Sequence, residues 1–343
     1  MSRKFNADIN QKICSQYDLN AYEALACGKG INILVVGDSI SALPYMYALK
    51  EQLSYDYGVD CSIKNISMSS SKSYAGYVRT NLLEEDFIYD LAIICFGQND
   101  KNDVFPVEYE SVIRSILNMN PDCCIISILE SSQRTYTEKM QGIIELAEYY
   151  NIPIADTIAA FEESEFPYEK LCSDGVHPNE QGQEIYFSLL NRIIAEHVQQ
   201  CFNQKTLYLQ SLVSGKISAN ESPWEHTSHF RPIPLHSEVS KFDTFTFYSP
   251  TDFQRINDTT YEITLDHVSG IPGLYGNRFP DHNDVKIYLN DELLYHLEED
   301  FYHSFMQAMI SPLENESRTF DGTLRIEFQD HKHAEAFWGF IIS

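Results

Sequence analysis

A short apolar run that ends abruptly in Gly-Asp-Ser constrains the fold more than any other feature of this sequence. Residues 31–36 read Ile-Asn-Ile-Leu-Val-Val, a mostly β-branched or apolar pattern that is typical of a strand buried in a parallel sheet. The chain breaks at Gly37-Asp38-Ser39, and apolar residues then recur at helical spacing from Leu43 to Leu53. Ser39 is therefore expected where a strand ends and a helix begins, which is where open α/β sheets carry their chemistry.

The alternation of strands and helices continues to about residue 200. Five strands alternating with helices predict a parallel sheet covered on both faces, and we assign this α/β part to residues 1–204. After the first strand and helix, further strands are expected at 59–68, 90–96, 123–129 and 152–158, and helices at 74–83, 106–119, 138–149 and 181–199.

Near residue 205 the helical periodicity gives way to short alternating runs. These predict a second, all-β domain over residues 205–343 that is built as a sandwich. Asn290-Asp291 between two of the runs predicts a tight hairpin. The expected strands cover 242–248, 261–265, 285–289, 293–297, 324–328 and 336–342.

Composition narrows the range of partners and compartments. The 343 residues are 43% hydrophobic, which is enough to fill two cores, and the formal net charge of −26 repels phosphate backbones and anionic membrane surfaces. We therefore expect no nucleic-acid partner. Neither a signal peptide nor a membrane span is visible as an apolar run, which predicts a cytoplasmic protein with no membrane contact. The eight cysteines show no CxxC spacing, so reduced thiols are expected.

Three loops carry the residues that suggest chemistry. A serine hydroxyl such as that of Ser39 is a weak nucleophile without an adjacent base, and His177 can supply that base. Asp174, three residues earlier, can fix the tautomer of the imidazole and stabilise the imidazolium. Backbone N–H groups after the second and third strands, together with the Asn99 amide, are candidate donors to an oxyanion. Taken alone, Gly37-Asp38-Ser39 favours a βα turn whose serine caps the helix, and the two later loops reverse that preference.

The three loops together carry a family resemblance. Gly37-Asp38-Ser39, Gly97-Gln98-Asn99-Asp100 and Asp174-Gly175-Val176-His177-Pro178 resemble the first, third and fifth signature blocks of the SGNH, or GDSL, hydrolase superfamily, over about residues 30–200. The resemblance implies a flavodoxin-like three-layer fold. It also implies Ser39 as nucleophile, His177 as base, Asp174 as the residue that orients it and Asn99 as an oxyanion donor. It implies neither a metal nor another cofactor.

One signature block departs from the family pattern. Where the family usually places an oxyanion-hole glycine after the second strand, this chain reads Asn65-Ile-Ser-Met-Ser-Ser70, and the aligned residue is Ser70. A backbone N–H donor needs no particular side chain, so Ser70 can serve beside the Ser39 N–H, but its side chain would crowd the acyl pocket. Gly76 is the alternative for this position.

These residues favour a serine-type acyl-ester hydrolase acting on an O-acylated carbohydrate or a similar small ester. An O-acetyltransferase with the same Ser-His-Asp site, drawing on acyl-CoA, is the second hypothesis, and a non-catalytic carbohydrate-binding protein is the third. His226 with His229 and His331 with His333 could ligate a metal, but they lack cysteine partners or a helical HExxH frame. We expect solvated histidines and no metal.

Overall fold

The computed structural model describes residues 19–84, 87–213, 245–278, 282–300, 307–314 and 316–343. The pair His226 and His229 lies outside these residues, as does the beginning of the strand expected at 242–248.

A five-stranded sheet forms the centre of the N-terminal part. Its strand order is β2-β1-β3-β4-β5, and every neighbouring pair is parallel. The expected α/β fold with a flavodoxin-like strand order is therefore confirmed. The strands are β1 (Asn32–Gly37), β2 (Ser62–Asn65), β3 (Leu91–Cys95), β4 (Cys124–Leu129) and β5 (Ile154–Asp156).

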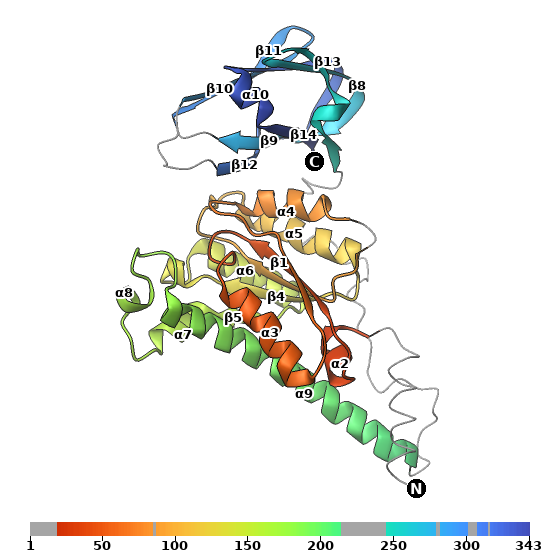
Figure 1. Ribbon diagram of the computed structural model, residues 1–343, viewed down its shortest axis with the longest axis vertical. Coiled ribbons are helices and arrows are strands. Elements are labelled where there is room, and N and C mark those ends of the chain that lie inside the picture. Colours follow the sequence, from red (N-terminus) through yellow and green to blue (C-terminus); the bar gives the residue numbers. More distant parts are fainter. Residues whose placement is uncertain (1–18, 85–86, 214–244, 279–281, 301–306, 315) are drawn as a thin grey trace.

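Helices cover both faces of this sheet and make three layers (Figure 1). One face packs against α2 (Ala21–Ala26), α3 (Tyr45–Tyr57) and α9 (Glu180–Val213). The other face packs against α4 (Ser73–Asn81), α5 (Phe105–Met119) and α6 (Glu138–Tyr150). The remaining short helices are η1 (Ser131–Gln133), α7 (Thr157–Glu162) and α8 (Tyr168–Leu171).

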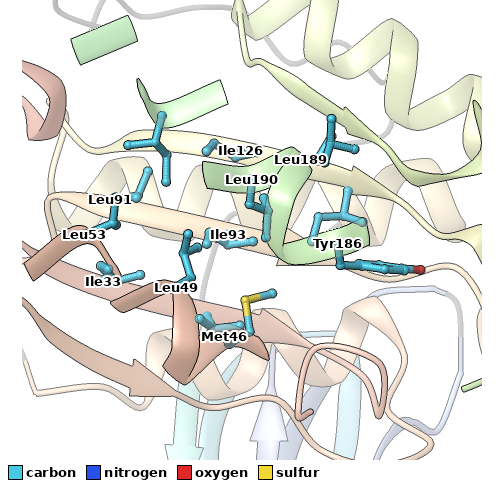
Figure 2. Packing of buried hydrophobic residues seen from close by; sticks show 14 of the residues in the cluster. Ile33, Met46, Leu49, Leu53, Leu91, Ile93, Ile126, Tyr186, Leu189 and Leu190 are labelled. Carbon is cyan, nitrogen blue, oxygen red and sulfur yellow. The ribbon is translucent and has the colours of Figure 1, made fainter. Parts of the chain in front are cut away.

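The apolar faces of α3 and α9 explain why these helices lie on the sheet. Figure 2 shows Met46 and Leu49 of α3 beside Ile33 and Ile93 of the sheet, with Leu190 of α9 in the same cluster. All five side chains are fully buried. Burial of each such side chain stabilises the fold by about 1.5–3 kcal/mol. These helices therefore hold the loops at their N-termini against a rigid core.

Two strand predictions were too long. β2 covers Ser62–Asn65 instead of 59–68, since the Asn65 side chain turns the chain by donating to the Ser41 carbonyl and accepting from the Ser67 N–H. β5 ends at Asp156 instead of reaching residue 158, because the Asp156 carboxylate caps α7 by accepting from the Ala159 N–H at 3.0 Å.

The predicted extent of helix α9 was too short. It runs to Val213 and not to residue 199, passing through residue 204. Beyond residue 199 the helix keeps buried side chains, Lys205 and Tyr208, and Lys205 donates to the Ala26 carbonyl at the end of α2. The domain boundary at residues 204 and 205 stays a prediction.

The C-terminal part consists of two antiparallel sheets, as expected for an all-β domain. Their strand orders are β11-β10-β13-β8-β7 and β12-β9-β14-β6, and apolar residues of both sheets form one core. The two sheets thus enclose the core as a sandwich, with the short helices η2 (Pro250–Asp252) and α10 (His331–Glu335) beside them. The strands are β6 (Thr246–Tyr248), β7 (Gln254–Asn257), β8 (Thr260–Gly270), β9 (Pro272–Arg278), β10 (His282–Leu289), β11 (Glu292–Asp300), β12 (Gln307–Pro312), β13 (Arg318–Phe328) and β14 (Phe337–Ile342).

The predicted hairpin at Asn290-Asp291 is confirmed. Both residues have positive φ, at 52° and 66°, and Leu289 pairs directly with Glu292 across the turn. Asparagine and aspartate tolerate this conformation better than most residues, which is why they favour two-residue hairpin turns.

The β sandwich packs on helix α4 of the N-terminal part (Figure 1). Ile341 of β14 belongs to the same buried cluster as Tyr74 of α4. The hydroxyl of Tyr74 lies 3.4 Å from Ser343 Oγ, and the rings of Tyr77 and Phe245 meet edge to face at 5.8 Å. The two parts therefore share an apolar interface at α4.

Candidate active site

The polar residues singled out in the sequence meet at one edge of the parallel sheet. Ser39 follows β1 by two residues, Asn99 follows β3, and His177 precedes α9. Because the carboxyl ends of parallel strands share an edge, the loops after β1 and β3 lie side by side, and α9 brings the third loop to them.

Ser39, His177 and Asp174 form a continuous chain of hydrogen bonds. Ser39 Oγ lies 2.8 Å from His177 Nε2, and His177 Nδ1 lies 2.7 Å from Asp174 Oδ2. When Nδ1 carries the proton and donates to the carboxylate, Nε2 accepts from the Ser39 hydroxyl. This arrangement matches a nucleophile, its base and the carboxylate that orients the base.

The loop itself fixes the Asp174 carboxylate. Oδ1 accepts from the N–H groups of Val176 and His177 at 2.9 and 2.8 Å, while Oδ2 binds the imidazole. The hydrogen bond from the His177 ring, followed by these two from the backbone, lowers the pKa of Asp174 to about 2. Gly175 lets the chain turn here, because its φ of +82° is rarely adopted by residues with a side chain. Asp174 is therefore ionised wherever His177 has to act as a base.

The turn that presents Ser39 depends on its two preceding residues. Asp38 is fully buried, and its Oδ1 accepts from the Ile40 N–H at 2.9 Å. A Cβ on Gly37 would lie 2.0 Å from Ser41 Oγ and 2.4 Å from the Cys95 carbonyl oxygen. Only glycine fits at this close approach of β1, β3 and the turn.

Asn99 reaches from the loop after β3 toward the other two loops. Its Nδ2 donates to the Ser71 carbonyl at 3.1 Å and to Asp38 Oδ2 at 3.3 Å. The amide group is thus held between the loop after β1 and the loop after β2. Both N–H groups of the amide are thus donated within the protein, so the expected role of an oxyanion donor requires that one of these acceptors be exchanged.

The two candidates for the remaining oxyanion donor lie in different environments. Ser70 is exposed in the loop after β2 and has a φ of 56°. Gly76 lies inside α4, where its N–H donates to the Lys72 carbonyl at 3.2 Å. A Cβ on Gly76 would lie 2.5 Å from the Phe96 ring, so this glycine allows α4 to pack closely on the sheet.

Sequence reasoning missed two buried charged residues beside this site. Arg79 of α4 is 7% exposed, and its Nη2 donates to the Gly37 carbonyl at 3.2 Å and to Ser71 Oγ at 3.1 Å. Burial lowers the pKa of Arg79 to about 10. A single arginine in a helix gives no sequence signal. Glu130, which is fully buried, does give one: it follows a wholly apolar strand at the carboxyl edge of the sheet.

Two groupings within the described part of the chain place three metal-ligating side chains close together. Asp38, Cys95 and Glu130 are buried beside the turn that carries Ser39, whereas Asp266, His267 and Asp321 are exposed on the β sandwich. Of the two histidines in α10 that were expected to be solvated, His331 is exposed but His333 is only 4% exposed, so the expectation is wrong for His333. His333 binds Asp330 Oδ1 at 2.7 Å, and His331 lies 3.0 Å from an Arg255 nitrogen.

The fold and the hydrogen-bonded site together define the class of the N-terminal part. A parallel sheet of this strand order, with serine, histidine and aspartate joined at its carboxyl edge, is the architecture of a serine acyl-hydrolase domain. The model of the GDSL-like Lipase/Acylhydrolase family matches residues 35–185, which include Ser39, Asn99, Asp174 and His177.

Solved structures extend the likeness to both parts of the chain. Two structures of a two-domain esterase (CEX) active on acetylated mannans, one of them co-crystallised with mannopentaose, align with TM-scores of 0.63 and 0.64. Each alignment covers 94% of this chain and 93% of the other at 13% identity, which establishes a common fold. No curated protein matches the sequence significantly. Among the described residues, no helix is long and apolar enough to cross a membrane.

Proposed function

We propose that this chain is a serine-type ester hydrolase that removes acetyl or similar small acyl groups from O-acylated carbohydrates. The observation that carries the proposal is the hydrogen-bonded chain from Ser39 through His177 to Asp174 at the carboxyl edge of the sheet. Its geometry supports nucleophilic catalysis by Ser39, with His177 as general base.

The proposed reaction has two steps. In the first, Ser39 Oγ attacks the ester carbonyl carbon while its proton passes to His177 Nε2, and His177 then gives that proton to the leaving sugar oxygen. In the second step a water molecule gives a proton to His177 and attacks the acyl-serine. As the bond between the acyl carbon and Ser39 Oγ breaks, His177 returns that proton to Oγ, which releases the free acid and regenerates both residues. Asp174 stabilises the imidazolium in both steps without taking up a proton itself.

The tetrahedral intermediate of each step carries a negative oxygen that needs donors. We assign the Ser39 N–H, the Ser70 N–H and Asn99 Nδ2 to this role. Ser70 is preferred over Gly76 because the Gly76 N–H already donates within α4. For Asn99 to serve, one of its two present acceptors, Asp38 or the Ser71 carbonyl, gives way to the oxyanion.

The carbohydrate part of the proposal draws support from the β sandwich and the likeness to the two-domain mannan esterase over both parts of the chain. On β14, Trp338 is 38% exposed and its ring lies 5.0 Å from that of Tyr275, edge to face. Exposed aromatic rings of this kind suit the apolar faces of sugar rings. A net charge of −26 disfavours a strongly anionic polymer.

Product analysis tests the proposed reaction. We expect the full chain to release free acetate from p-nitrophenyl acetate and from acetylated manno- or xylo-oligosaccharides, and the S39A variant to lose this activity. Ser62, an exposed serine on β2, gives the matched control S62A, which should retain it. If most of the acyl group of acyl-CoA were instead transferred to a sugar, the protein would be an acyltransferase and the proposed hydrolase function would be wrong. No turnover of any ester or acyl donor would favour a binding protein.

A further inference from the structure

Two carboxyl groups are buried together beside the turn that carries Ser39. Asp38 precedes Ser39 in the turn after β1, and Glu130 follows β4, so the two residues come from different loops at the carboxyl edge of the sheet. Both residues are 0% exposed. A carboxylate oxygen of each lies within 4.8 Å of the other and of Cys95 Sγ.

The hydrogen bonds around the pair are unequal. Asp38 accepts two N–H groups, from Ile40 at 2.9 Å and from the Asn99 amide at 3.3 Å. Glu130 accepts a hydrogen bond from Cys95 Sγ at 3.6 Å and another from Ser132 Oγ at 3.4 Å. Asp38 is therefore better solvated as an anion, and Glu130 is better suited to carry a proton and donate it to Asp38. The two carboxyl groups are close enough that each shifts the pKa of the other.

Within the described residues, no cation forms an ion pair with either carboxyl group. Lys139 of α6 donates to the carbonyls of Gly97 and Asp100, and Arg79 donates to the carbonyl of Gly37 and to Ser71. Two adjacent carboxylates in a dry, unpaired environment repel each other and lose hydration, so one proton has to remain between them.

We propose that Asp38 and Glu130 share one proton and act as a single monoanionic pair that positions the nucleophile turn and Asn99, with Glu130 as the positioning residue. Burial raises the pKa of Asp38 to about 7. Burial, followed by repulsion from Asp38, raises the pKa of Glu130 well above its ordinary value. Both directions agree with retention of a proton at neutral pH.

The shared proton matters for catalysis because of where the pair sits, and this step rests on the proposed function. Asp38 holds the N–H of Ile40 next to Ser39 and holds Asn99 in the loop after β3. A second negative charge on the pair would attract the Asn99 amide more strongly. It would also repel the negative oxygen of the tetrahedral intermediate, which needs the same amide as a donor. Loss of the proton at alkaline pH is therefore expected to lower kcat.

Other titratable groups face the pair and are the same in wild type and variant. Asp100 adds negative charge, and His177 favours the charged form of Asp38. Burial lowers the pKa of Arg79 of α4, and the charge of Asp38 raises it by less. The groups that face the pair from neighbouring elements are Asp100 after β3, Cys95 of β3, Arg79 of α4, Tyr109 of α5, Tyr45 of α3, Tyr186 of α9 and His177 before α9.

The first experiment does not depend on activity. E130Q replaces the proton-carrying carboxyl by an amide that donates to Asp38 at every pH, and E110Q is the matched control because Glu110 is buried in α5 against Tyr150 and Arg114. Above the ordinary carboxyl pKa, the folded wild type keeps a proton on the pair that the unfolded chain has lost. Tm should therefore fall as the pH rises from that ordinary value through the raised pKa values of Asp38 and Glu130.

We expect this fall in Tm to be shallower in E130Q and unchanged in E110Q. The infrared band of a protonated carboxyl at neutral pH should also lose intensity in E130Q only. An equal Tm slope and an equal carboxyl band in wild type and E130Q would overturn the shared proton. A stoichiometric divalent metal ion that is present in wild type and absent in E130Q would overturn it too, because the cation would then take the place of the proton.

The second experiment reads kcat against pH with p-nitrophenyl acetate. Wild type and E110Q should lose kcat at alkaline pH, whereas E130Q should keep it, because only one charge remains beside the turn that carries Ser39. E130A, which removes the donor to Asp38, should lower kcat at neutral pH about tenfold. This loss is smaller than the roughly 10²- to 10³-fold cost of deleting an oxyanion donor, because Asn99 itself stays in place. E130Q should restore most of that loss.

The two proposals fail in distinguishable ways. Absence of ester hydrolysis by wild type, together with the expected Tm and infrared differences, would refute the proposed function and leave the shared proton in place. Normal hydrolysis with identical alkaline limbs in wild type and E130Q would refute the positioning role of Glu130 and leave the hydrolase in place.

Discussion

At the scale of single residues, the site is a set of short loops whose side chains fix one another. Asp174 binds two backbone N–H groups of its own loop as well as the imidazole of His177. Asn99 is held between Asp38 and the Ser71 carbonyl. Each side chain is therefore oriented before a substrate arrives, which is a requirement for catalysis by positioning.

Replacement of Asp174 tests the orientation of His177. D174N keeps an oxygen for the backbone N–H groups but can impose the wrong imidazole tautomer, so kcat should fall about 10³- to 10⁴-fold. The control is the circular dichroism spectrum, which should stay unchanged because Asp174 is 58% exposed. A kcat within a few-fold of wild type would remove Asp174 from the mechanism.

The lowered pKa of Asp174 also predicts a pH effect. A carboxyl whose pKa falls from 3.8 to about 2 on folding contributes stability above pH 3.8 and loses it as the pH falls toward 2. The acid-induced unfolding of D174N should therefore show a weaker pH dependence in this window. An identical pH dependence of Tm in both proteins would contradict the hydrogen bonds assigned to Asp174.

Replacement of Asn99 tests the oxyanion site. N99A should lower kcat about 10²- to 10³-fold with little change in KM, because the amide is needed mainly in the transition state. Asn102, an exposed asparagine whose amide donates to Glu138, gives the matched control N102A. A rise in KM without loss of kcat would make Asn99 a substrate-binding residue instead.

The placement of Ser39, Asn99 and His177 could be predicted because each follows or precedes a strongly periodic element. Glu130 and Arg79 could not be assigned a role in the same way. Their partners, Asp38 in one case and Gly37 with Ser71 in the other, are distant in sequence, and only the packed sheet and α4 bring them together. Tertiary contacts of this kind leave no pattern of spacing.

At the scale of elements, the sequence predicted which strands and helices exist better than where they end. Hydrogen bonds made by side chains determine where these strands end. Asn65 turns the chain after β2, and Asp156 ends β5 by capping α7. In the sandwich, β7, β9 and β12 were missed. β9 begins with Pro272-Gly273 and contains Gly276, and such residues weaken the alternating pattern by which strands are identified.

Gly37 connects β1 with the nucleophile turn and yields an element-scale prediction. G37A places a methyl group against the Cys95 carbonyl and Ser41, so the turn has to shift and the free energy of unfolding should drop by about 1–3 kcal/mol, with loss of activity. In G142A, at a site inside α6 where a Cβ would come no closer than 3.4 Å to Pro106, the change should be neutral or stabilising. Equal effects of the two substitutions in urea unfolding would contradict the close approach at Gly37.

At the scale of the whole molecule, the two parts are joined at α4. Ile341 shares a buried cluster with Tyr74, and the Tyr77 ring meets Phe245. Arg79 of the same helix contacts the last residue of β1 and the loop after β2, so α4 lies between the β sandwich and the candidate active site. This arrangement could not be read from the sequence, because an interface between two domains has no periodicity of its own.

Truncation tests how far the α/β part is independent. Residues 1–213 keep α9 complete and retain the core between the sheet, α3 and α9. We expect this chain to fold, with a lower Tm than the full chain because α4 loses its cover, and to hydrolyse p-nitrophenyl acetate. An unfolded or insoluble product would mean that the two parts share one folding unit, and the predicted boundary near residue 204 would fail with it.

The nucleophilic character of Ser39 is the central claim, and covalent labelling measures it most directly. Incubation of the full chain with a fluorophosphonate, followed by peptide mass spectrometry, should place the probe on the peptide that contains Ser39. Labelling should disappear in H177A, because Ser39 then lacks its base. Equal labelling of wild type and S39A, or exclusive modification of another serine, would contradict the account.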